Sequence, residues 1–358
     1  MNKPKIFHLI TSLNIGGTEQ YLLTILTNLK DKYDFSVGYL KENGEIGKEI
    51  ENLKIPVKKF SFFELIKYLK ENKINIIHTH LYRANIVGRI AGKIAGTPTI
   101  ISSQRSIDGW KKFYHVWLDT ITSKSCNLII ANSEYAKNIL IIRENISENK
   151  IKVVYNGIPT GNISGVQHPP FNINNPIIGY IGRLHNEKGV YLIPEIAKIV
   201  IEKNPKIKFF IVGDGHEMNS LKLKIEKYKL NNSVEFHGWD RILGNIYHKI
   251  DILLLPSEEE SLPQAALEAM SFGIPVIASD VGGVSELVED EKTGLLIKNR
   301  APEEFANKII SLTENNYIFS YYSGNSKEKA HNFTIEIMIN SIDNIYQSFL
   351  SMIPIKSR

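Results

Sequence analysis

The chain has 358 residues, 43% of them hydrophobic and 23% charged, and a formal net charge of +5. This is the composition of an ordinary globular protein, so we expect no long disordered stretch, and no apolar run approaches the roughly 18 residues that a bilayer span needs. The single cysteine, Cys126, excludes an intramolecular disulfide and a cysteine-based zinc site. The length predicts two domains of about 150–180 residues each, and we expect the protein in the cytosol.

The charge is unevenly shared along the chain. Residues 1–165 carry about +9 and the remainder about −4, counting Lys and Arg against Asp and Glu. Such an asymmetry predicts that the N-terminal half meets an anionic partner. We expect no nucleic-acid partner.

Apolar strand patterns alternate with helical patterns through the N-terminal half, which predicts a parallel α/β sheet. A first strand at 5–11 leads into Gly16 and Gly17 and then a helix at 19–29. The two glycines suit either the close approach of a ligand to the backbone or a plain turn, and no third glycine completes a dinucleotide motif. Further elements are strands at 34–39, 74–78, 99–103 and 128–131 and helices at 62–72, 82–95 and 113–123.

Two histidines, His78 and His80, end one of these strands, at the sheet edge where ligands of parallel sheets collect. No carboxylate or cysteine stands near them at metal-ligand spacing. We therefore expect them to pack in a loop or to contact an acceptor, and we do not expect zinc.

Residues 160–176, with their glycines, asparagines and prolines, break every periodic pattern and predict a linker. A second alternation then starts with a strand at 176–182 and a loop that carries Arg183 and Lys188. Two cations five residues apart at the end of a strand can converge on two phosphates, although by themselves they also suit a solvated loop.

Two carboxylates flank a helix start in the second half of the chain. A strand, a loop, a helix and a strand are expected at 251–256, 257–263, 264–272 and 276–279. The N–H groups of Gln264 and Ala265 then point out of the helix start, where the helix dipole favours a phosphate. Glu260, before the helix, and Glu268, one turn inside it, either border one crevice and grip hydroxyl groups or are solvated charges.

The run E-S-L-P-Q-A-A-L-E, from Glu260 to Glu268, and the following A-M-S-x-G-x-P-V-I-A-S resemble the signature of glycosyltransferase family 4. The G-G-x-E after the first strand and the G-R-L-x-x-x-K-G from Gly182 are similar to family motifs as well. Members of this family are retaining GT-B enzymes that use activated sugars. The resemblance implies that Glu260 faces the donor sugar and that Glu268 binds the ribose of the nucleotide.

The sequence departs from the family at three places, one of which is Pro159, where the family's N-G-I-D has its Asp. Ser261 replaces the usual glycine after the first glutamate of the signature, which affects only the local loop. Many members carry a histidine near the donor sugar, and Arg105 stands at that place. Arg105 either contacts an anionic acceptor or reflects a different course of its loop, and His115 is a weaker candidate for the missing imidazole.

We predict the α/β class and the GT-B fold, in which two Rossmann-like domains face each other across a cleft. Residues 1–165 would bind the acceptor, residues 175–330 the nucleotide sugar, and a helix within 331–358 would cross back to the first domain. The implied reaction moves a sugar, with retention, from a nucleoside diphosphate sugar, expected to be UDP-linked, to a saccharide or lipid-linked acceptor of surface polysaccharide synthesis. A sugar-nucleotide 2-epimerase and a non-catalytic sugar-nucleotide-binding protein are the alternatives.

The predicted site needs no metal and no cofactor, because cations and a helix start can stabilise the charge on the leaving diphosphate. No nucleophile stands out, which favours a same-face mechanism in which the leaving phosphate accepts the acceptor's proton. The residues assigned to catalysis are Glu260, Arg183, Lys188 and Arg105. Those assigned to the donor are Gly16, Gly17, Glu268, Gly213, Trp239, Leu262, Gln264 and Ala265.

Lysines and aromatic residues mix at 58–63 and at 110–117, with Lys58, Lys59, Lys111 and Lys112 among them. Such a mixture suits an anionic membrane surface or an ordinary amphipathic helix. Many members of the family glycosylate lipid-carried acceptors. We therefore expect reversible binding to an anionic membrane surface, and a protein that is cytoplasmic or peripheral on the inner face of the cell membrane.

Overall fold

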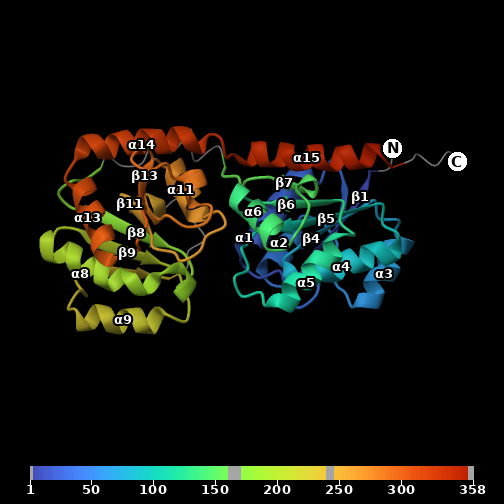
Figure 1. Cartoon of the computed structure of the whole chain (residues 1–358), viewed down its shortest axis with the longest axis horizontal. Helices are drawn as coiled ribbons and strands as arrows, with labels where there is room; N and C mark the ends of the chain where they lie inside the picture. The colour runs from blue at the N-terminus through green and yellow to red at the C-terminus, as the bar shows by residue number, and fades with distance from the viewer. Residues whose placement is uncertain (1–2, 160–170, 239–245, 354–358) are drawn as a thin grey trace. The chain divides into compact units, whose positions relative to one another are not determined.

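In the computed structural model, the described residues are 3–159, 171–238 and 246–353 (Figure 1). They form two compact units, each considered by itself. Unit 1 is Met1–Asn156 together with Ile335–Arg358, and unit 2 is Gly157–Thr334. Each unit is built on one parallel sheet, so the predicted pair of Rossmann-like α/β domains is confirmed. Trp239 lies outside the described residues.

Unit 1 has a seven-stranded sheet in the order β3-β2-β1-β4-β5-β6-β7. Its strands are β1 (Lys5–Ile10), β2 (Asp34–Tyr39), β3 (Val57–Lys59), β4 (Ile76–His80), β5 (Thr99–Gln104), β6 (Leu128–Ala131) and β7 (Ile151–Val153). Its helices are α1 (Gly17–Leu29), α2 (Glu45–Asn52), α3 (Phe62–Glu71), α4 (Tyr82–Ala95), α5 (Phe113–Ser123), α6 (Glu134–Ile142) and α15 (Ile335–Ser351).

Both faces of this sheet are covered, which is why its strands are apolar on both sides. Along β1, Ile6 and Ile10 belong to the core cluster that α1 and α15 complete. Phe7 and Leu9 point to the opposite face and belong to the cluster on the α3 and α4 side. The register of a parallel sheet therefore decides which polar side chains share the α1 and α15 face.

The last helix, α15, is part of unit 1. Ile342 and Tyr346 are fully buried in the same core as α1. Asp343 accepts hydrogen bonds from Tyr33 Oη and Lys32 Nζ, both at 2.6 Å. The predicted return of the C-terminal helix to the first domain is confirmed.

Unit 2 has a six-stranded sheet in the order β10-β9-β8-β11-β12-β13. Its strands are β8 (Ile177–Ile181), β9 (Lys208–Val212), β10 (Val234–His237), β11 (Ile252–Leu255), β12 (Val276–Ser279) and β13 (Gly294–Ile297). Its α-helices are α8 (Ile193–Lys203), α9 (Met218–Lys227), α11 (Gln264–Ser271), α12 (Val284–Leu287), α13 (Pro302–Thr313) and α14 (Asn316–Ala330). Within the described ranges of both units, no helix is long and apolar enough to cross a membrane.

The strand order reverses once in each sheet, between β1 and β4 in unit 1 and between β8 and β11 in unit 2. Ligands of open α/β sheets bind at the carboxyl ends of the strands beside such a reversal. In unit 2 the loops at that position are residues 182–192 and 256–263, and in unit 1 they are residues 11–16 and the turn after β4. Topology alone thus places most of the predicted site residues at two sheet edges.

Three local predictions were wrong. β4 runs from Ile76 to His80, so the strand expected to end at His78 continues to His80, and both histidines pack inside a buried strand and not in a loop. Helix α14 was not predicted, because its residues show no clear apolar face in the sequence. Lys111, expected at a membrane surface, has a side chain that is 0% exposed and forms ion pairs with Asp119 at 2.6 Å and Glu144 at 2.8 Å.

Candidate active site

The loop between β11 and α11 holds Glu260 in a fixed backbone position. Gly282, after β12, has a φ of +58°, and a Cβ there would lie 1.8 Å from the carbonyl oxygen of Glu260. The N–H of Gly283 donates to that same oxygen at 2.9 Å. Only glycine permits both the backbone conformation and the close approach. Loops from two neighbouring strands therefore fix the position of Glu260.

The side chain of Glu260 is paired with Lys188. Lys188 Nζ lies 2.8 Å from Glu260 Oε1, and Ser257 Oγ donates to the same oxygen at 2.9 Å. Glu260 is only 8% exposed. The loop after β8 brings Lys188 here because Gly189, with a φ of +65°, lies against the carbonyl of Pro256, where a Cβ would be 1.8 Å away. Two residues that were predicted separately thus form one partly buried ion pair.

Glu268 lies on the first turns of α11, beside Tyr247. Tyr247 Oη donates to Glu268 Oε2 at 2.7 Å, and Gln264 Nε2 donates to Glu268 Oε1 at 3.1 Å. Burial raises the pKa of Glu268, while these two hydrogen bonds oppose the rise. Tyr247 was missed in the sequence, because no motif marks it and it lies 21 residues before its partner. The pair forms a hydrogen-bonding group suited to hydroxyls.

Helix α11 begins at Gln264, as predicted, with Pro263 as its N-cap. The first bonds of its ladder run from the N–H groups of Ala266 and Leu267 to the carbonyl of Pro263. The amides of Gln264 and Ala265 precede that ladder, at the positive end of the helix dipole. Leu262 is 6% exposed and packs in the interior.

Arg183 and Gly213 have local roles in the structure. Arg183 Nη2 pairs with Glu187 Oε1 at 2.8 Å, and both side chains are more than half exposed, at 63% and 55%. Gly213 has a φ of +140°, and a Cβ there would lie 1.9 Å from the carbonyl oxygen of Gly182. The packing of two backbones therefore already explains this glycine, and a donor contact of Gly213 stays a prediction.

At the corresponding edge of unit 1, Gly16 and Gly17 lead into α1. Gly16 has extended backbone, with a φ of −171°. A Cβ on Gly16 would lie 2.4 Å from Glu19 Oε2, so the folded position of the Glu19 carboxylate requires glycine. Nothing lies within 4 Å of a Cβ built on Gly17, so the chain itself does not demand glycine there.

Arg105 lies on the same unit, just after β5. The centre of its guanidinium is 3.4 Å from the ring centroid of Tyr21, and Nη2 donates to Asn156 Oδ1. Burial lowers the pKa of Arg105 to about 10, so it remains a cation at neutral pH. The other candidate, His115, lies on α5, where its Nδ1 accepts a hydrogen bond from the Lys112 N–H at 3.1 Å. His115 therefore caps a helix.

His78 and His80 meet a third histidine that the sequence did not single out. His8 on β1 stands in register with His78 on β4, and Nδ1 of His8 lies 3.0 Å from Nε2 of His80. All three residues are 0% exposed. One ring nitrogen from each of the three lies within 4.8 Å of the other two. The shared face was not visible in the sequence, because β1 and β4 are about 70 residues apart and their register is a tertiary property.

Two family models cover most of the chain. Residues 15–162 match the model described as Glycosyltransferase Family 4, and residues 166–334 match the model described as Glycosyl transferases group 1. A UDP-Gal:alpha-D-GlcNAc-diphosphoundecaprenol alpha-1,3-galactosyltransferase of Escherichia coli is 31% identical over 304 residues, which cover 80% of this chain and 78% of that protein. The capsular polysaccharide biosynthesis glycosyltransferase CapM of Staphylococcus aureus is 24% identical over 384 residues, 98% of each chain.

Solved structures share the fold. Anabaena Alr3699/HepE in complex with UDP superimposes with a TM-score of 0.86 at 24% identity, covering 96% of this chain and 100% of that one. The same protein in complex with UDP-glucose gives a TM-score of 0.86. These likenesses confirm the predicted fold class.

Proposed function

The chain belongs to the family 4 (group 1) glycosyltransferases, and we propose that it transfers a sugar from a UDP-sugar to a saccharide carried on a lipid diphosphate. The reaction would belong to the assembly of a surface polysaccharide, as the name of the capsular relative says of that protein, and the name of the galactosyltransferase relative gives a UDP-sugar donor and a diphosphate-linked acceptor for that one. The single observation that carries the proposal is the partly buried Lys188–Glu260 ion pair, formed in the loops before α11, the helix that carries Glu268. These groups match the chemistry of a sugar, a ribose and a diphosphate.

The donor would be held by unit 2. Lys188 and the amide end of α11 supply positive charge for the diphosphate, which gains negative charge as the bond to the sugar breaks. Glu268, with Tyr247 and Gln264 on its two oxygens, retains acceptor capacity for the ribose hydroxyls. Arg183 would join only by leaving its exposed partner Glu187, and surface ion pairs of that kind are weak.

The reaction would retain the anomeric configuration. Glu260 is engaged by Lys188 and Ser257, which suits a group that orients the donor sugar better than one that attacks it. In a same-face transfer, the bond between the sugar's anomeric carbon and the phosphate oxygen breaks. The acceptor oxygen bonds to the same face, and its proton passes to the leaving phosphate. No metal ion enters this scheme, since protein cations and amides bear the developing charge.

A product assay tests this proposal. The purified protein is incubated with UDP-glucose, UDP-galactose, UDP-N-acetylglucosamine or UDP-N-acetylgalactosamine, each with and without a saccharide linked to a lipid diphosphate. The products are identified by mass spectrometry and NMR. We expect one donor to be consumed only when acceptor is present, with an α linkage from an α donor. Conversion of the donor to a 2-epimer without acceptor would establish the epimerase alternative. UDP-sugar binding with no turnover of any acceptor would favour the non-catalytic alternative.

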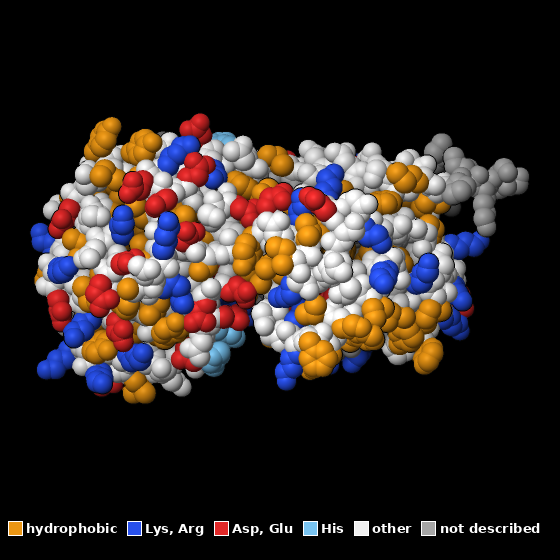
Figure 2. All heavy atoms as spheres, in the orientation of Figure 1, with side chains coloured by type: hydrophobic (Ala, Val, Ile, Leu, Met, Phe, Trp, Pro, Cys, Tyr) orange, Lys and Arg blue, Asp and Glu red, His pale blue; other side chains and the backbone are white. Residues whose placement is uncertain are grey.

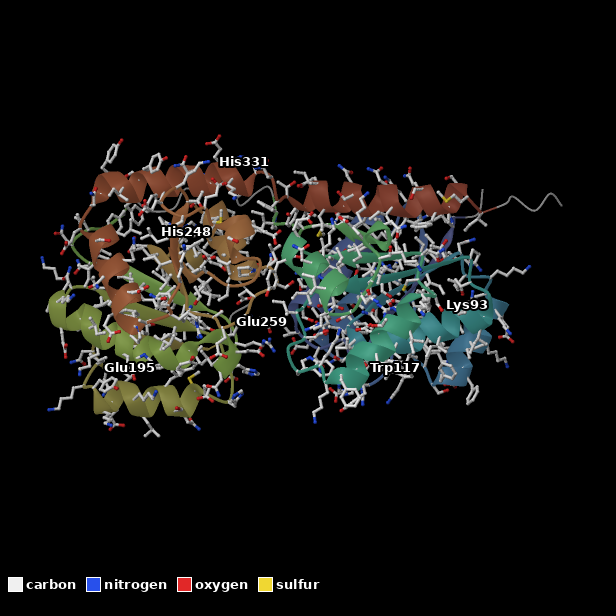
Figure 3. All side chains as sticks on the ribbon, in the orientation of Figure 1. Lys93, Trp117, Glu195, His248, Glu259 and His331 are labelled. Atoms are coloured by element: carbon white, nitrogen blue, oxygen red, sulfur yellow. The ribbon has the colours of Figure 1, made fainter. Side chains whose placement is uncertain are left out.

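We also propose that the protein works as a cytoplasmic enzyme, peripheral to the membrane that carries its acceptor. Exposed aromatic side chains support this: Phe113 is 85% exposed, Trp117 60% and Trp110 57%. Figure 2 shows hydrophobic side chains gathered over α3, α4 and α5, and Figure 3 labels Trp117 on α5. Exposed lysines nearby, Lys112 among them, supply charge for anionic headgroups.

Vesicle sedimentation tests the peripheral location. The double variant Phe113→Ser, Trp117→Ser should sediment less with anionic vesicles than the native protein, and binding should fall as salt rises to about 0.5 M. Ile142→Ser, which removes an equally exposed apolar side chain from α6, is the matched control. Native protein that stays in the supernatant with anionic vesicles at low salt would exclude the membrane contact.

A further inference from the structure

Buried polar side chains line the face of the unit 1 sheet that α1 and α15 cover. His8 on β1 and His78 and His80 on β4 have ring centroids 4.3 to 5.3 Å apart. Ser103 on β5 lies beside His78, and Arg105 follows directly after that strand, with its guanidinium over the ring of Tyr21 on α1. This row of side chains leads toward the carboxyl edge, where the strand order reverses.

Three clustered imidazoles raise the question of a metal ion. Burial lowers the pKa of His78 and His80, and the charge of Arg105 lowers it further, so both rings are neutral. However, the same charge repels a divalent cation. Both nitrogens of His78 are also engaged, Nδ1 with Tyr346 Oη at 2.7 Å and Nε2 with Ser103 Oγ at 2.8 Å. With no carboxylate among the ligands to offset Arg105, the cluster does not favour a metal.

The cation itself is the unusual feature. Arg105 contacts the ring of Tyr21 and the side-chain oxygen of Asn156, neither of which carries a negative charge at neutral pH. Within the described parts of the chain, no carboxylate lies within ion-pair distance of its guanidinium, and its buried Nη1 has no hydrogen-bond partner. Buried charges in proteins are normally paired, because an unpaired one loses its hydration without compensation. An anion that arrives with a ligand would supply the missing charge.

Other donors without partners accompany it. Thr11 Oγ1 and Nδ1 of His80 are buried, and neither has a hydrogen-bond partner among the described residues. The hydroxyl of Tyr21 is also buried, and it faces Ser103 and Arg105. The Tyr21 ring lies 6.1 Å from that of His80, and Thr11 directly follows β1, next to the strand that ends at His80. A positive charge beside the Tyr21 hydroxyl, with a further hydroxyl and an imidazole at the same sheet edge and no carboxylate within ion-pair distance among the described residues, matches an oxyanion.

We propose that Arg105 and Tyr21 form the centre of an oxyanion-binding subsite in unit 1, and that its ligand is a phosphate group of the acceptor. The assignment of the phosphate to the acceptor rests on the proposed function, whereas anion binding by Arg105 does not. The guanidinium would meet phosphate oxygens through Nη1, and the hydroxyl of Tyr21 would donate to the same group.

The test uses the full chain with its donor site saturated by UDP. Inorganic phosphate and pyrophosphate are titrated at constant ionic strength, by calorimetry and by thermal shift, into the native protein and into Arg105→Gln. Arg83→Gln, which removes an exposed arginine from α4, is the matched control for the loss of one charge. We expect Arg83→Gln to bind like the native protein and Arg105→Gln to bind at least about tenfold more weakly, as the loss of a charge-assisted contact predicts.

If Arg105 instead supports the fold, Arg105→Gln without anion should melt below the native temperature. If the charge serves a ligand, Arg105→Gln without anion should melt at or above the native temperature, because a partly buried charge that has no carboxylate partner among the described residues is gone. Should that variant not fold, Tyr21→Phe keeps the ring under the guanidinium and is expected to weaken phosphate binding by about threefold. No phosphate binding to the native protein, or equal binding to all variants, would overturn the proposal.

Two further comparisons identify the source of the anion. Phosphate affinity that is the same with and without UDP supports an acceptor phosphate. Competition between UDP and the Arg105-dependent phosphate would assign the subsite to the donor and overturn the acceptor assignment. Acetate that binds as tightly as phosphate would also overturn it, in favour of a carboxylate. If UDP does not bind at all, the proposed function fails, while the difference between Arg105→Gln and Arg83→Gln remains measurable.

Discussion

The carboxyl edges of the two sheets hold their cations in opposite ways. In unit 2, Lys188 lies 2.8 Å from Glu260, so the pair is neutral as a whole. In unit 1, Arg105 has an aromatic ring and an amide oxygen as partners, and no carboxylate among the described residues. Both edges have the same topology, so the side chains alone create the difference. The paired edge is complete before a ligand arrives, whereas the unpaired edge gains its counter-charge from one.

The two edges should therefore respond differently to substitution. Removing one member of a buried pair leaves the other charge uncompensated, which is strongly destabilising. Removing a charge that has no partner leaves no uncompensated charge behind, so stability should not fall. Substitutions in unit 2 should therefore combine functional loss with a disturbance of the partner. Those at Arg105 should separate stability from binding.

Glu260→Gln is expected to have the largest effect. The amide keeps the size of the side chain and can still accept a hydrogen bond from Ser257, but Lys188 loses its counter-charge. We expect kcat to fall about 100-fold, the scale of removing one preorganised electrostatic contact, with UDP affinity unchanged or higher. Steady-state kinetics measures both values. Glu258→Gln, at an exposed carboxylate bound to Tyr191 Oη, is the control and should leave kcat unaltered.

Lys188→Ala breaks the same pair from the basic side. UDP should bind about 10- to 100-fold more weakly, a loss of about 1.5–3 kcal/mol, because a charge-assisted contact to the diphosphate disappears. Uridine should bind nearly as before. Arg183→Ala is the matched comparison, and its exposed pair with Glu187 predicts an effect below about 1 kcal/mol. Calorimetry with both ligands decides, since equal losses for UDP and uridine would contradict a phosphate contact.

The two edges show which features of the site can be predicted from the sequence and which cannot. Motifs within one loop predicted the strand, the helix start and the positions of Glu260 and Lys188 correctly, because they depend on local propensity and on the period of apolar residues. The direct pairing of the two was not predicted, since they are 72 residues apart and meet only through the β8–β11 neighbourhood.

The contacts that the sequence analysis failed to predict share one cause, which is that they depend on tertiary structure. His8 joins His78 and His80 through strand register, Tyr247 reaches Glu268 from another segment, and Lys111 turns inward to a buried acid pair. None of these contacts lies within one motif. A lysine beside tryptophan and phenylalanine looks like a surface residue until tertiary partners are known, which is why the membrane prediction named Lys111 wrongly.

Glu268→Gln should have an intermediate effect and a telling pH dependence. Burial raises the pKa of Glu268, so the folded protein binds that proton more tightly than the unfolded chain. The carboxyl therefore contributes stability below its unfolded pKa that is lost as the pH rises through the folded pKa. At pH 7 the free energy of unfolding of Glu268→Gln should equal or exceed that of the native protein. The difference between the two should vanish toward about pH 4.

The affinity of Glu268→Gln for UDP and for uridine should fall, whereas its stability at pH 7 should not. The amide still accepts one hydrogen bond, but the charge that strengthens a ribose contact is gone, so UDP and uridine should both bind about fivefold more weakly. Urea denaturation across pH and calorimetry supply the two measurements. A variant that is less stable at pH 7 with unchanged uridine affinity would assign Glu268 to structure and not to the ribose.

Chelation of divalent ions should have the smallest effect, and it tests whether the paired edge is electrostatically sufficient. The leaving diphosphate needs positive charge, which Lys188 and the start of α11 bring from the protein itself. We therefore expect EDTA to change the initial rate by less than about twofold.

Lys188→Ala is the informative background, because a bound metal would mask part of the activity that this variant loses, and chelation would then increase the loss. A rate that falls tenfold in EDTA and returns with excess Mg²⁺ or Mn²⁺ would mean that the donor arrives with its own cation. In that case the Lys188–Glu260 pair orients the sugar without neutralising the leaving group.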